Sequence, residues 1–382
     1  EIAAISGEMD VEDLIPEEDC VLTLTNFGYV KRQTLDTYRT QRRGGRGISG
    51  MSRREEDVAS ELFIANSHDF VLFFSDRGRV YRLKCYEIPE GSRTSRGMNI
   101  TNLLPLEPEE RITSMLRVTK SEEEDHFLTM VTKNAVIKRV ALSAFRNVRK
   151  NGLIALDLAE DDELSWVRLT SGSDDLLVAT RFGKAIRFHE ADVREMGRQA
   201  RGVRAIRLAE GDEVVGVCIC REGGTVLTVT ENGKGRRSDI DTYRITARGG
   251  RLSNPEDYRL QHRGGMGILN YHVEKYGNVA AIKVVDLNDD IILIADDGVI
   301  IRIEAGSIRI CARPSKGVRV MKVNEGSKVI TMARAPHDDE EEISAVEDDG
   351  TAEEGEDEPV TEAEDVIRDD EPAEETEETT EE

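Results

Sequence analysis

The sequence lacks the residue patterns of disulfide-stapled, membrane-spanning, metal-binding and nucleotide-hydrolysing proteins. Its five cysteines are an odd number without a CxxC spacing, which predicts small core residues in a reducing cytosol rather than a disulfide framework. No apolar run is long enough to cross a bilayer, and no signal peptide is recognisable. P-loop, HExxH and GxSxG motifs are absent. The sequence therefore offers no catalytic residue, no metal site and no cofactor site.

The chain also lacks a net positive charge, because its formal net charge is -24. All of that charge lies in residues 338–382, which hold 25 Asp and Glu against one basic residue, Arg368. The preceding residues carry 51 basic and 51 acidic side chains and are neutral overall. An anion-binding surface must therefore come from uneven placement of charge. The acidic tail, residues 336–382, is almost free of large apolar residues and is predicted to be disordered.

A repeat of about 50 residues occurs six times, which is the period of a four-stranded blade rather than of a helical solenoid. Each copy opens with an apolar strand and a turn of the form T-x-x-G-x-x-x-R, whose glycine suits a hairpin position with positive φ. In copy three, Asn134 is expected to take the role of the missing glycine. The six turns are Thr25/Gly28/Arg32, Ser75/Gly78/Arg82, Thr132/Ala135/Arg139, Thr180/Gly183/Arg187, Thr230/Gly233/Arg237 and Ala295/Gly298/Arg302.

A second anchor, a glycine before an apolar residue, follows each turn at an almost constant distance. From the arginine to this glycine the offsets are 15, 15, 13, 15, 30 and 15 residues. The long offset in copy five fits a local duplication, because residues 241–251 and 258–267 both resemble residues 36–47. The anchors are Gly47/Ile48, Gly97/Met98, Gly152/Leu153, Gly202/Val203, Gly267/Ile268 and Gly317/Val318.

Two further alternating apolar runs follow each second anchor, so each copy holds four short strands. We therefore predict an all-β fold, a closed propeller-like array of six four-stranded blades, because closure removes exposed sheet edges. Residues 1–18, which begin at Glu1 without a Met, are expected to be the end of a linker in a fragment of a longer chain. The blades are expected at about residues 19–66, 67–122, 123–172, 173–222, 223–286 and 287–335.

The heptapeptide QRRGGRG in copy one has the composition of a polyanion clamp. Glycine lets backbone N–H groups approach phosphates, and arginine offers planar forks that match phosphate oxygens. The same seven residues also fit a flexible RGG-type surface loop. The degraded recurrence of the motif at residues 258–267, inside a repeat, favours the clamp. Its residues are Gln41, Arg42, Arg43, Gly44, Gly45, Arg46 and Gly47.

Six blade-like repeats with this heptapeptide in the first copy closely resemble the C-terminal domain of the DNA gyrase A protein, over residues 19–335. The heptapeptide matches the motif called the gyrase A box. The resemblance implies a six-bladed β-pinwheel, in which neighbouring blades exchange a strand. It also implies a DNA-wrapping module that is not itself an enzyme, since no segment resembles the domain with the catalytic tyrosine.

The resemblance further implies partners and a location. The partners are double-stranded DNA, the N-terminal catalytic domain of the same gyrase A polypeptide, and the gyrase B protein in an A2B2 heterotetramer that supercoils DNA with ATP. The implied location is the cytoplasm, in association with the nucleoid and without a membrane. No cofactor is expected in this domain.

Wrapping requires cations at regular intervals along a curved edge and no base-reading groups. The residue just before the second anchor is cationic in four of the six copies. For the arginine that ends each hairpin turn, a structural role and a DNA-binding role both remain open. The candidate DNA contacts beside the box are Arg96, Arg201, Arg263, Lys316, Arg248 and Arg251.

Two other interpretations of the function remain. One is the corresponding domain of topoisomerase IV, which binds DNA without wrapping it tightly, although the intact box disfavours it. The other is a protein-interaction propeller of the WD40 or kelch type, which is disfavoured because neither signature recurs.

Overall fold

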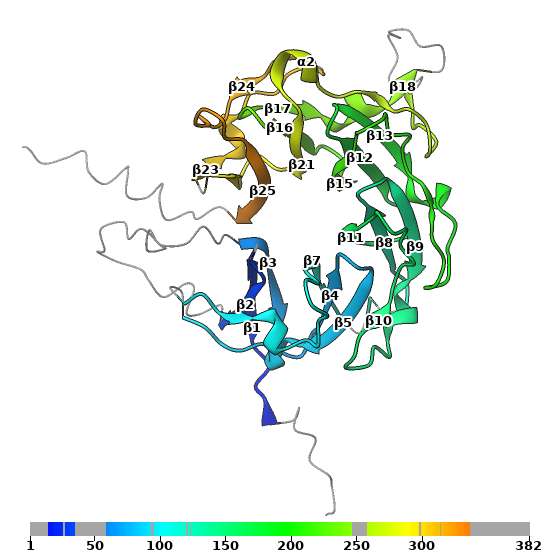
Figure 1. The fold of residues 1–382 in the computed structure, drawn as a ribbon, viewed down its shortest axis with the longest axis vertical. Coiled ribbons are helices and arrows are strands. Elements are labelled where there is room, and N and C mark those ends of the chain that lie inside the picture. The colour runs from blue at the N-terminus through cyan, green and yellow to red at the C-terminus, as the bar shows by residue number, and fades with distance from the viewer. Residues whose placement is uncertain are drawn as a thin grey trace, which may run out of the picture. The chain divides into compact units, whose positions relative to one another are not determined.

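Strands and tight turns make up almost all of the described chain (Figure 1). In the computed structural model, residues 1–337 form one unit and residues 338–382 another. Among the described residues the only α-helix is α2 (Val273–Tyr276), and no helix is long and apolar enough to cross a membrane. The described residues are 14–25, 27–34, 59–92, 95–119, 121–122, 124–246, 258–297, 299–313 and 315–336.

Six antiparallel sheets are arranged radially around a centre (Figure 1). The strands of each sheet are given from the inner strand outwards. The first sheet has β3 (Ala59–Asn66), β1 (Asp19–Thr25), β2 (Tyr29–Thr34) and β6 (Met98–Asn99), and the second has β7 (Ile112–Val118), β4 (Phe70–Ser75), β5 (Arg79–Lys84) and β10 (Leu153–Ile154). The third has β11 (Leu164–Thr170), β8 (Phe127–Thr132), β9 (Val136–Ala141) and β14 (Val203–Arg204). The fourth sheet has β15 (Val214–Cys220), β12 (Asp175–Thr180), β13 (Lys184–His189) and β20 (Ile268–Leu269), and the fifth has β21 (Val279–Val285), β16 (Thr225–Thr230), β17 (Lys234–Asp239) and β24 (Val318–Arg319). The sixth has β25 (Val329–Pro336), β22 (Asp289–Ala295) and β23 (Ile300–Glu304).

The outer strand of each four-stranded sheet comes from the next copy of the repeat. For example, Val203 of copy four pairs with Ile137 on β9 of copy three. This exchange confirms the pinwheel topology. Within the described residues, five sheets have four strands and the sixth has three, because no described strand covers β23.

The inner strands close the ring. Each lies against the inner strand of the next sheet, and β25 of the last sheet lies against β3 of the first. The insertion in copy five forms a separate two-stranded hairpin, β18 (Ile245–Thr246) with β19 (Tyr258–Arg259).

In the described residues the hydrophobic core consists of five clusters, each lying between two neighbouring sheets. On β4, Val71 and Phe73 face the first sheet, whereas Leu72 and Phe74 face the third. Because both faces of this strand are buried, its sequence is a continuous apolar run rather than an alternating one. The cores therefore hold the sheets to one another, and each blade depends on its neighbours for burial.

Hairpin turns form as the sequence predicts, with one correction. Gly28, Gly183 and Gly233 have φ between 71° and 78°, the left-handed region that glycine adopts without a steric penalty. In copy three, Ala135 itself takes φ 64°. The expectation that Asn134 would fill this role is wrong, because Ala135 and not Asn134 has the positive φ; the Asn134 side chain donates to the Asp161 carbonyl at 3.0 Å.

A belt of alternating ion pairs, which we call the ion-pair belt, links sheets two to five along their turns. Arg111, Lys133 and Arg181 each contact carboxylates from two different sheets. Exposed pairs of this kind contribute about 0.2–1 kcal/mol each, so the belt supplements the apolar cores. In order, its members are Asp76, Arg111, Glu163, Lys133, Glu213, Arg181 and Glu231.

The buried Cys85 thiol makes stability dependent on alkaline pH. Cys85 is 0% exposed, and burial raises its pKa to about 12. In the unfolded chain the pKa of a cysteine thiol is about 8.5. Above that pH the folded chain therefore keeps a proton that the unfolded chain has lost. Stability therefore falls as pH rises, by about 1.4 kcal/mol per unit. We expect the difference in unfolding free energy between wild type and Cys85→Ala to shrink between pH 9 and 10 in urea titrations; a constant difference would contradict this assignment.

Candidate nucleic-acid interface

The second anchor places one exposed residue at the outer edge of each four-stranded sheet. The outer strand starts directly after the anchor glycine, at the opposite edge of the sheet from the inner strand. The residue before that glycine is exposed in all five copies that the structure describes here, and in three of them it is a cation. These five residues are Arg96, Asn151, Arg201, Met266 and Lys316. The strand exchange thus turns a sequence repeat into regularly spaced positions on the outer edge.

The anchor glycines allow the outer strand to approach its neighbour closely. Gly202 has φ +91°, and a Cβ at this position would lie 2.6 Å from the Ile137 carbonyl oxygen. The same close approach to a neighbouring backbone carbonyl occurs at Gly97, Gly267 and Gly317. Only glycine satisfies both the backbone angle and the contact, which explains the glycine at these four anchors.

Replacing Gly202 by alanine is expected to destabilise the protein. The strained backbone alone costs about 1–3 kcal/mol, and the clash with the Ile137 carbonyl adds to it. Gly197 is a matched control in the same loop, because no atom lies within 4 Å of its position for a Cβ. Urea titrations should show a clear loss of unfolding free energy for Gly202→Ala and little change in it for Gly197→Ala. Equal midpoints for the two variants would show that the close approach is not needed.

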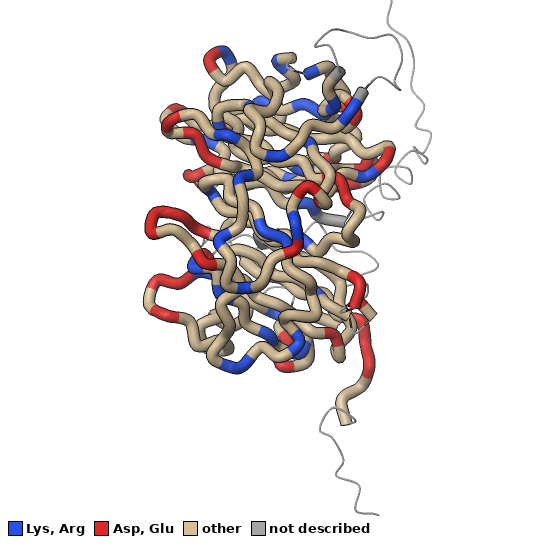
Figure 2. Tube along the Cα trace, turned by 90° about the vertical axis from the view of Figure 1, so that its right-hand side faces the viewer, with Lys and Arg blue, Asp and Glu red and all other residues tan. Residues whose placement is uncertain are grey.

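Charge is unevenly placed on parts of the surface. Figure 2 shows Asp and Glu in several loops along the left edge of the view, whereas Lys and Arg are interspersed with Asp and Glu over the rest of the trace. A chain without a net positive charge can still attract phosphates locally where cations gather.

Arg201 and Arg96 occupy the outer edge in different ways. The Arg201 side chain is 78% exposed, and its Nε lies 2.9 Å from the Asp157 carboxylate. Such an exposed pair is weak, so it leaves Arg201 able to reach a phosphate. The Arg96 guanidinium lies 3.9 Å from the centre of the Tyr29 ring on β2, the strand of the first sheet that pairs with β6. Lys31 supports the same loop by donating to the carbonyls of Ser92 and Ser95.

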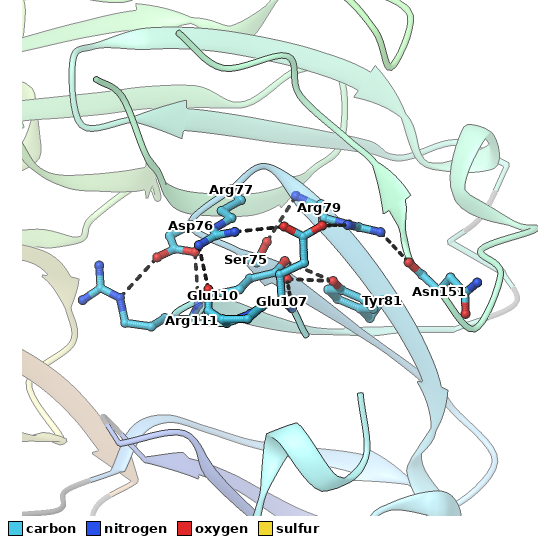
Figure 3. A network of polar contacts seen from close by, with 10 residues as sticks. Ser75, Asp76, Arg77, Arg79, Tyr81, Glu107, Glu110, Arg111 and Asn151 are labelled. Atoms are coloured by element: carbon cyan, nitrogen blue, oxygen red, sulfur yellow. Dashed lines mark hydrogen bonds and ion pairs between the residues drawn. The ribbon is translucent and has the colours of Figure 1, made fainter. Parts of the chain in front are cut away.

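The copy-three loop is held by a polar network on sheet two (Figure 3). Arg79 donates to the Asn151 carbonyl at 2.6 Å and to the Glu107 carboxylate at 2.7 Å. The Tyr81 hydroxyl donates to Glu110 at 3.0 Å, and burial together with this carboxylate raises the pKa of Tyr81 to about 12. Because Arg79 is engaged in this network, it stabilises the loop rather than offering a free charge at its tip.

Copy five has no cation at its edge position. Its edge residue, Met266, is 64% exposed and uncharged. Arg263, a candidate from the sequence, is half-buried and donates to the carbonyls of Asp192 at 2.9 Å and Arg204 at 3.2 Å. Arg263 therefore ties the loop to the edge of sheet three. In copy six, Lys316 is exposed, and its carbonyl accepts a hydrogen bond from the Tyr271 hydroxyl.

Five of the six arginines that end the hairpin turns lie between blades, whereas Arg302 pairs with Asp290 on its own sheet. Arg187 donates to the Ile240 carbonyl at 2.8 Å, and Arg237 donates to the Ile308 carbonyl at 2.8 Å. Arg32 makes the equivalent bond to Ile88 at 3.3 Å. In each case the acceptor belongs to the next copy. Of the two roles that the sequence left open, these contacts favour the structural one, because the guanidinium fastens adjacent blades.

The most basic described part of the edge surrounds β14. The segment from Arg194 to Arg207 contains five arginines and one glutamate. Arg204 lies on the outer strand itself and is exposed, as is Arg207. Neither was among the sequence candidates, although the regular steps of three residues from Arg201 to Arg204 and on to Arg207 could have revealed them. Arg319 on β24 is a further exposed cation of the same kind.

Several candidate residues lie outside the described residues. They are the box residues 41–47 together with Arg248 and Arg251. Their proposed contacts with DNA therefore stay predictions from the sequence.

A family model described as the C-terminal β-propeller domain of DNA gyrase matches seven segments of the chain. Two of these, residues 224–251 and 253–286, fall in copy five, where the sequence indicates a duplication. Together the matches cover well over half of the chain. The segments are residues 21–64, 69–119, 126–171, 174–220, 224–251, 253–286 and 289–336.

Two curated relatives from Staphylococcus aureus are similar over most of the chain. The DNA gyrase A protein of strain MRSA252 is 44% identical over 351 residues, which are 90% of this chain and 38% of that protein. The gyrase A protein of strain NCTC 8325 / PS 47 is 43% identical over 354 residues, with the same coverage of 90% and 38%. The chain thus spans less than two-fifths of the length of these relatives.

Two solved structures share the fold. The C-terminal domain of DNA topoisomerase IV matches with a TM-score of 0.70 at 24% identity, covering 87% of this chain and 98% of that one. The DNA gyrase A C-terminal domain matches with a TM-score of 0.63 at 25% identity, covering 83% and 99%.

Proposed function

The chain belongs to the family of the DNA gyrase A C-terminal domain, and we propose that it is a non-catalytic module that bends and wraps double-stranded DNA around its outer edge. One observation carries this proposal: the strand exchange sets an exposed position at the outer edge of five sheets, and three of those positions are cations. Since the sheets follow one another around a ring, these positions follow a curved path.

The chemistry of the edge suits phosphate binding. Arginine and lysine neutralise phosphates without reading bases, and phosphate contacts supply most of non-specific DNA affinity. Bending 20–30 base pairs by 40–90° costs on the order of 1–6 kcal/mol, so several contacts must offset it. The cluster of Arg201, Arg204 and Arg207 provides the densest set on the described edge.

In the whole protein, this module would deliver the bent DNA to the N-terminal catalytic domain of the same gyrase A polypeptide. That polypeptide would work with the gyrase B protein, in an A2B2 heterotetramer, as a type II topoisomerase that uses ATP to introduce negative supercoils. Catalysis and ATP hydrolysis would reside in those other parts, and the chain would need no cofactor of its own. Its place would be the cytoplasm, on the nucleoid.

The fold alone does not separate wrapping from the looser binding proposed for a topoisomerase IV domain, because both families share it. The QRRGGRG heptapeptide favours the gyrase function.

Two measurements test the proposal. Filter binding of duplex DNA to the 382-residue chain across a salt series should give a log–log slope of about -0.9 per phosphate contact. A protein-docking propeller would show no steep slope. In the second measurement, a nicked circular DNA is resealed by a ligase while the chain is bound to it. Wrapping should leave a change of linking number of one sign after the protein is removed; binding without such a change would support the topoisomerase IV type of function instead.

A further inference from the structure

The inner strands surround a hollow with a basic lining. The hollow has a volume of about 570 Å³, and residues from β3, β7, β11, β15, β21 and β25 line it. Figure 1 shows these strands around the centre of the ring. No Asp or Glu is among the described residues that line the hollow. Its basic side chains are Arg117, Arg168, Arg221, Lys283 and Arg334.

Arg168 is held in place by the backbone. Its Nε donates to the Val217 carbonyl on the next inner strand at 3.3 Å, and its Nη1 donates to the Val167 carbonyl at 2.9 Å. These neutral acceptors fix the side chain at the hollow without cancelling its charge. The guanidinium therefore contributes a preorganised positive charge to the wall.

Two of the arginines have a carboxylate neighbour outside the lining. Asp69 lies 4.0 Å from the Arg117 Nε, and Asp289 lies 3.5 Å from the Arg334 Nη1. Both arginines are more than two-fifths exposed, so these contacts are weak. Because neither carboxylate belongs to the lining, the wall of the hollow itself stays positive.

The residues between the cations are apolar in type, with Val217, Ile219, Ile282 and Val284 among them, and none of them offsets the positive charge. Several cations gathered in one concave site raise the local positive potential. The cations of the lining therefore repel one another, and a multivalent anion placed among them would relieve that repulsion.

The size and the donors of the hollow define the ligand. Small-molecule sites usually occupy about 300–1,000 Å³, whereas a DNA duplex requires a longer surface. Guanidinium forks pair with phosphate oxygens in a bidentate manner. We propose that this hollow binds a short polyphosphate, either as a free inorganic chain or as the triphosphate of a nucleotide. This site lies at the opposite edge of every sheet from the DNA-binding edge and does not depend on the proposed function.

Isothermal titration calorimetry of the 382-residue chain with inorganic tripolyphosphate tests the proposal. The double variant Arg117→Gln/Arg221→Gln should bind at least tenfold more weakly. The matched control is Arg149→Gln/Lys150→Gln, which removes two cations near the outer edge and should change binding less than twofold. Absence of binding to wild type, or equal losses in the two variants, would overturn the proposal.

Three further arms sharpen the result. Circular dichroism must show both variants folded, and Arg117→Lys/Arg221→Lys should bind more tightly than the glutamine variant but more weakly than wild type, because lysine keeps the charge and lacks the bidentate fork. ATP tested beside tripolyphosphate distinguishes the two sources: similar affinities indicate recognition of the phosphates alone, and tighter ATP binding indicates a nucleotide. Duplex DNA affinity should be unchanged in the Arg117→Gln/Arg221→Gln variant. If this variant lost affinity for both tripolyphosphate and duplex DNA, the hollow would belong to the DNA-binding surface, and the proposal of a separate site would be wrong.

Discussion

Replacing Arg42, Arg43 and Arg46 together by alanine is expected to abolish negative supercoiling by the reconstituted enzyme, while DNA cleavage and relaxation persist. Each of the five described second-anchor segments supplies the outer strand of the preceding sheet. The box ends at the remaining anchor, Gly47, so by the same rule we expect it at the junction between the first and sixth copies. Loss of three cations there would interrupt a continuous DNA path but leave the other contacts.

A topology assay on relaxed plasmid measures the effect of the box variant. The matched control is Arg77→Ala/Arg111→Ala/Lys133→Ala, which removes three exposed cations that pair with carboxylates. The control should supercoil normally, since each exposed pair contributes less than about 1 kcal/mol. Supercoiling by the box variant at the wild-type rate would refute the assignment, and its loss in the control would show that the assay reports general stability.

The second large effect is expected at the β14 cluster. Replacing Arg201, Arg204 and Arg207 by alanine should weaken duplex binding at every sequence equally, because phosphate contacts carry no base specificity. If all three touch phosphates, the log–log salt slope becomes less negative by about 2.7. Filter binding between low and physiological salt measures this slope.

The same triple variant at Arg77, Arg111 and Lys133 serves as the control for the β14 cluster, because it removes an equal charge from the surface. Its salt slope should stay within about 0.5 of the wild type. An unchanged slope in the β14 variant would place the DNA path elsewhere on the ring. Equal changes in both variants would show that net charge, rather than the outer edge, governs binding.

The repeat, the hairpin turns and the anchor glycines could be predicted because their causes are local. A hairpin depends on the backbone angles of a few consecutive residues, so glycine at Gly28 or Gly233 is visible in the sequence. Ala135 shows the limit of this reasoning, because the surrounding sheet holds it at positive φ without glycine. The exposure of Arg96, Arg201 and Lys316 also followed from their positions in the sequence, since each directly precedes an anchor glycine.

By itself, then, the sequence determined the six copies, their strands and the residues before each second anchor. Only the tertiary structure decided which groups these and the other basic residues contact. That Arg237 fastens the next blade through the Ile308 carbonyl, and that Arg263 binds the Arg204 carbonyl, depends on which strands pair across distant copies. The basic hollow is the clearest case, because Arg117 and Arg334 approach the same space only when the ring of inner strands closes. Closure is a long-range event, and no local pattern in the sequence records which side chains it brings together.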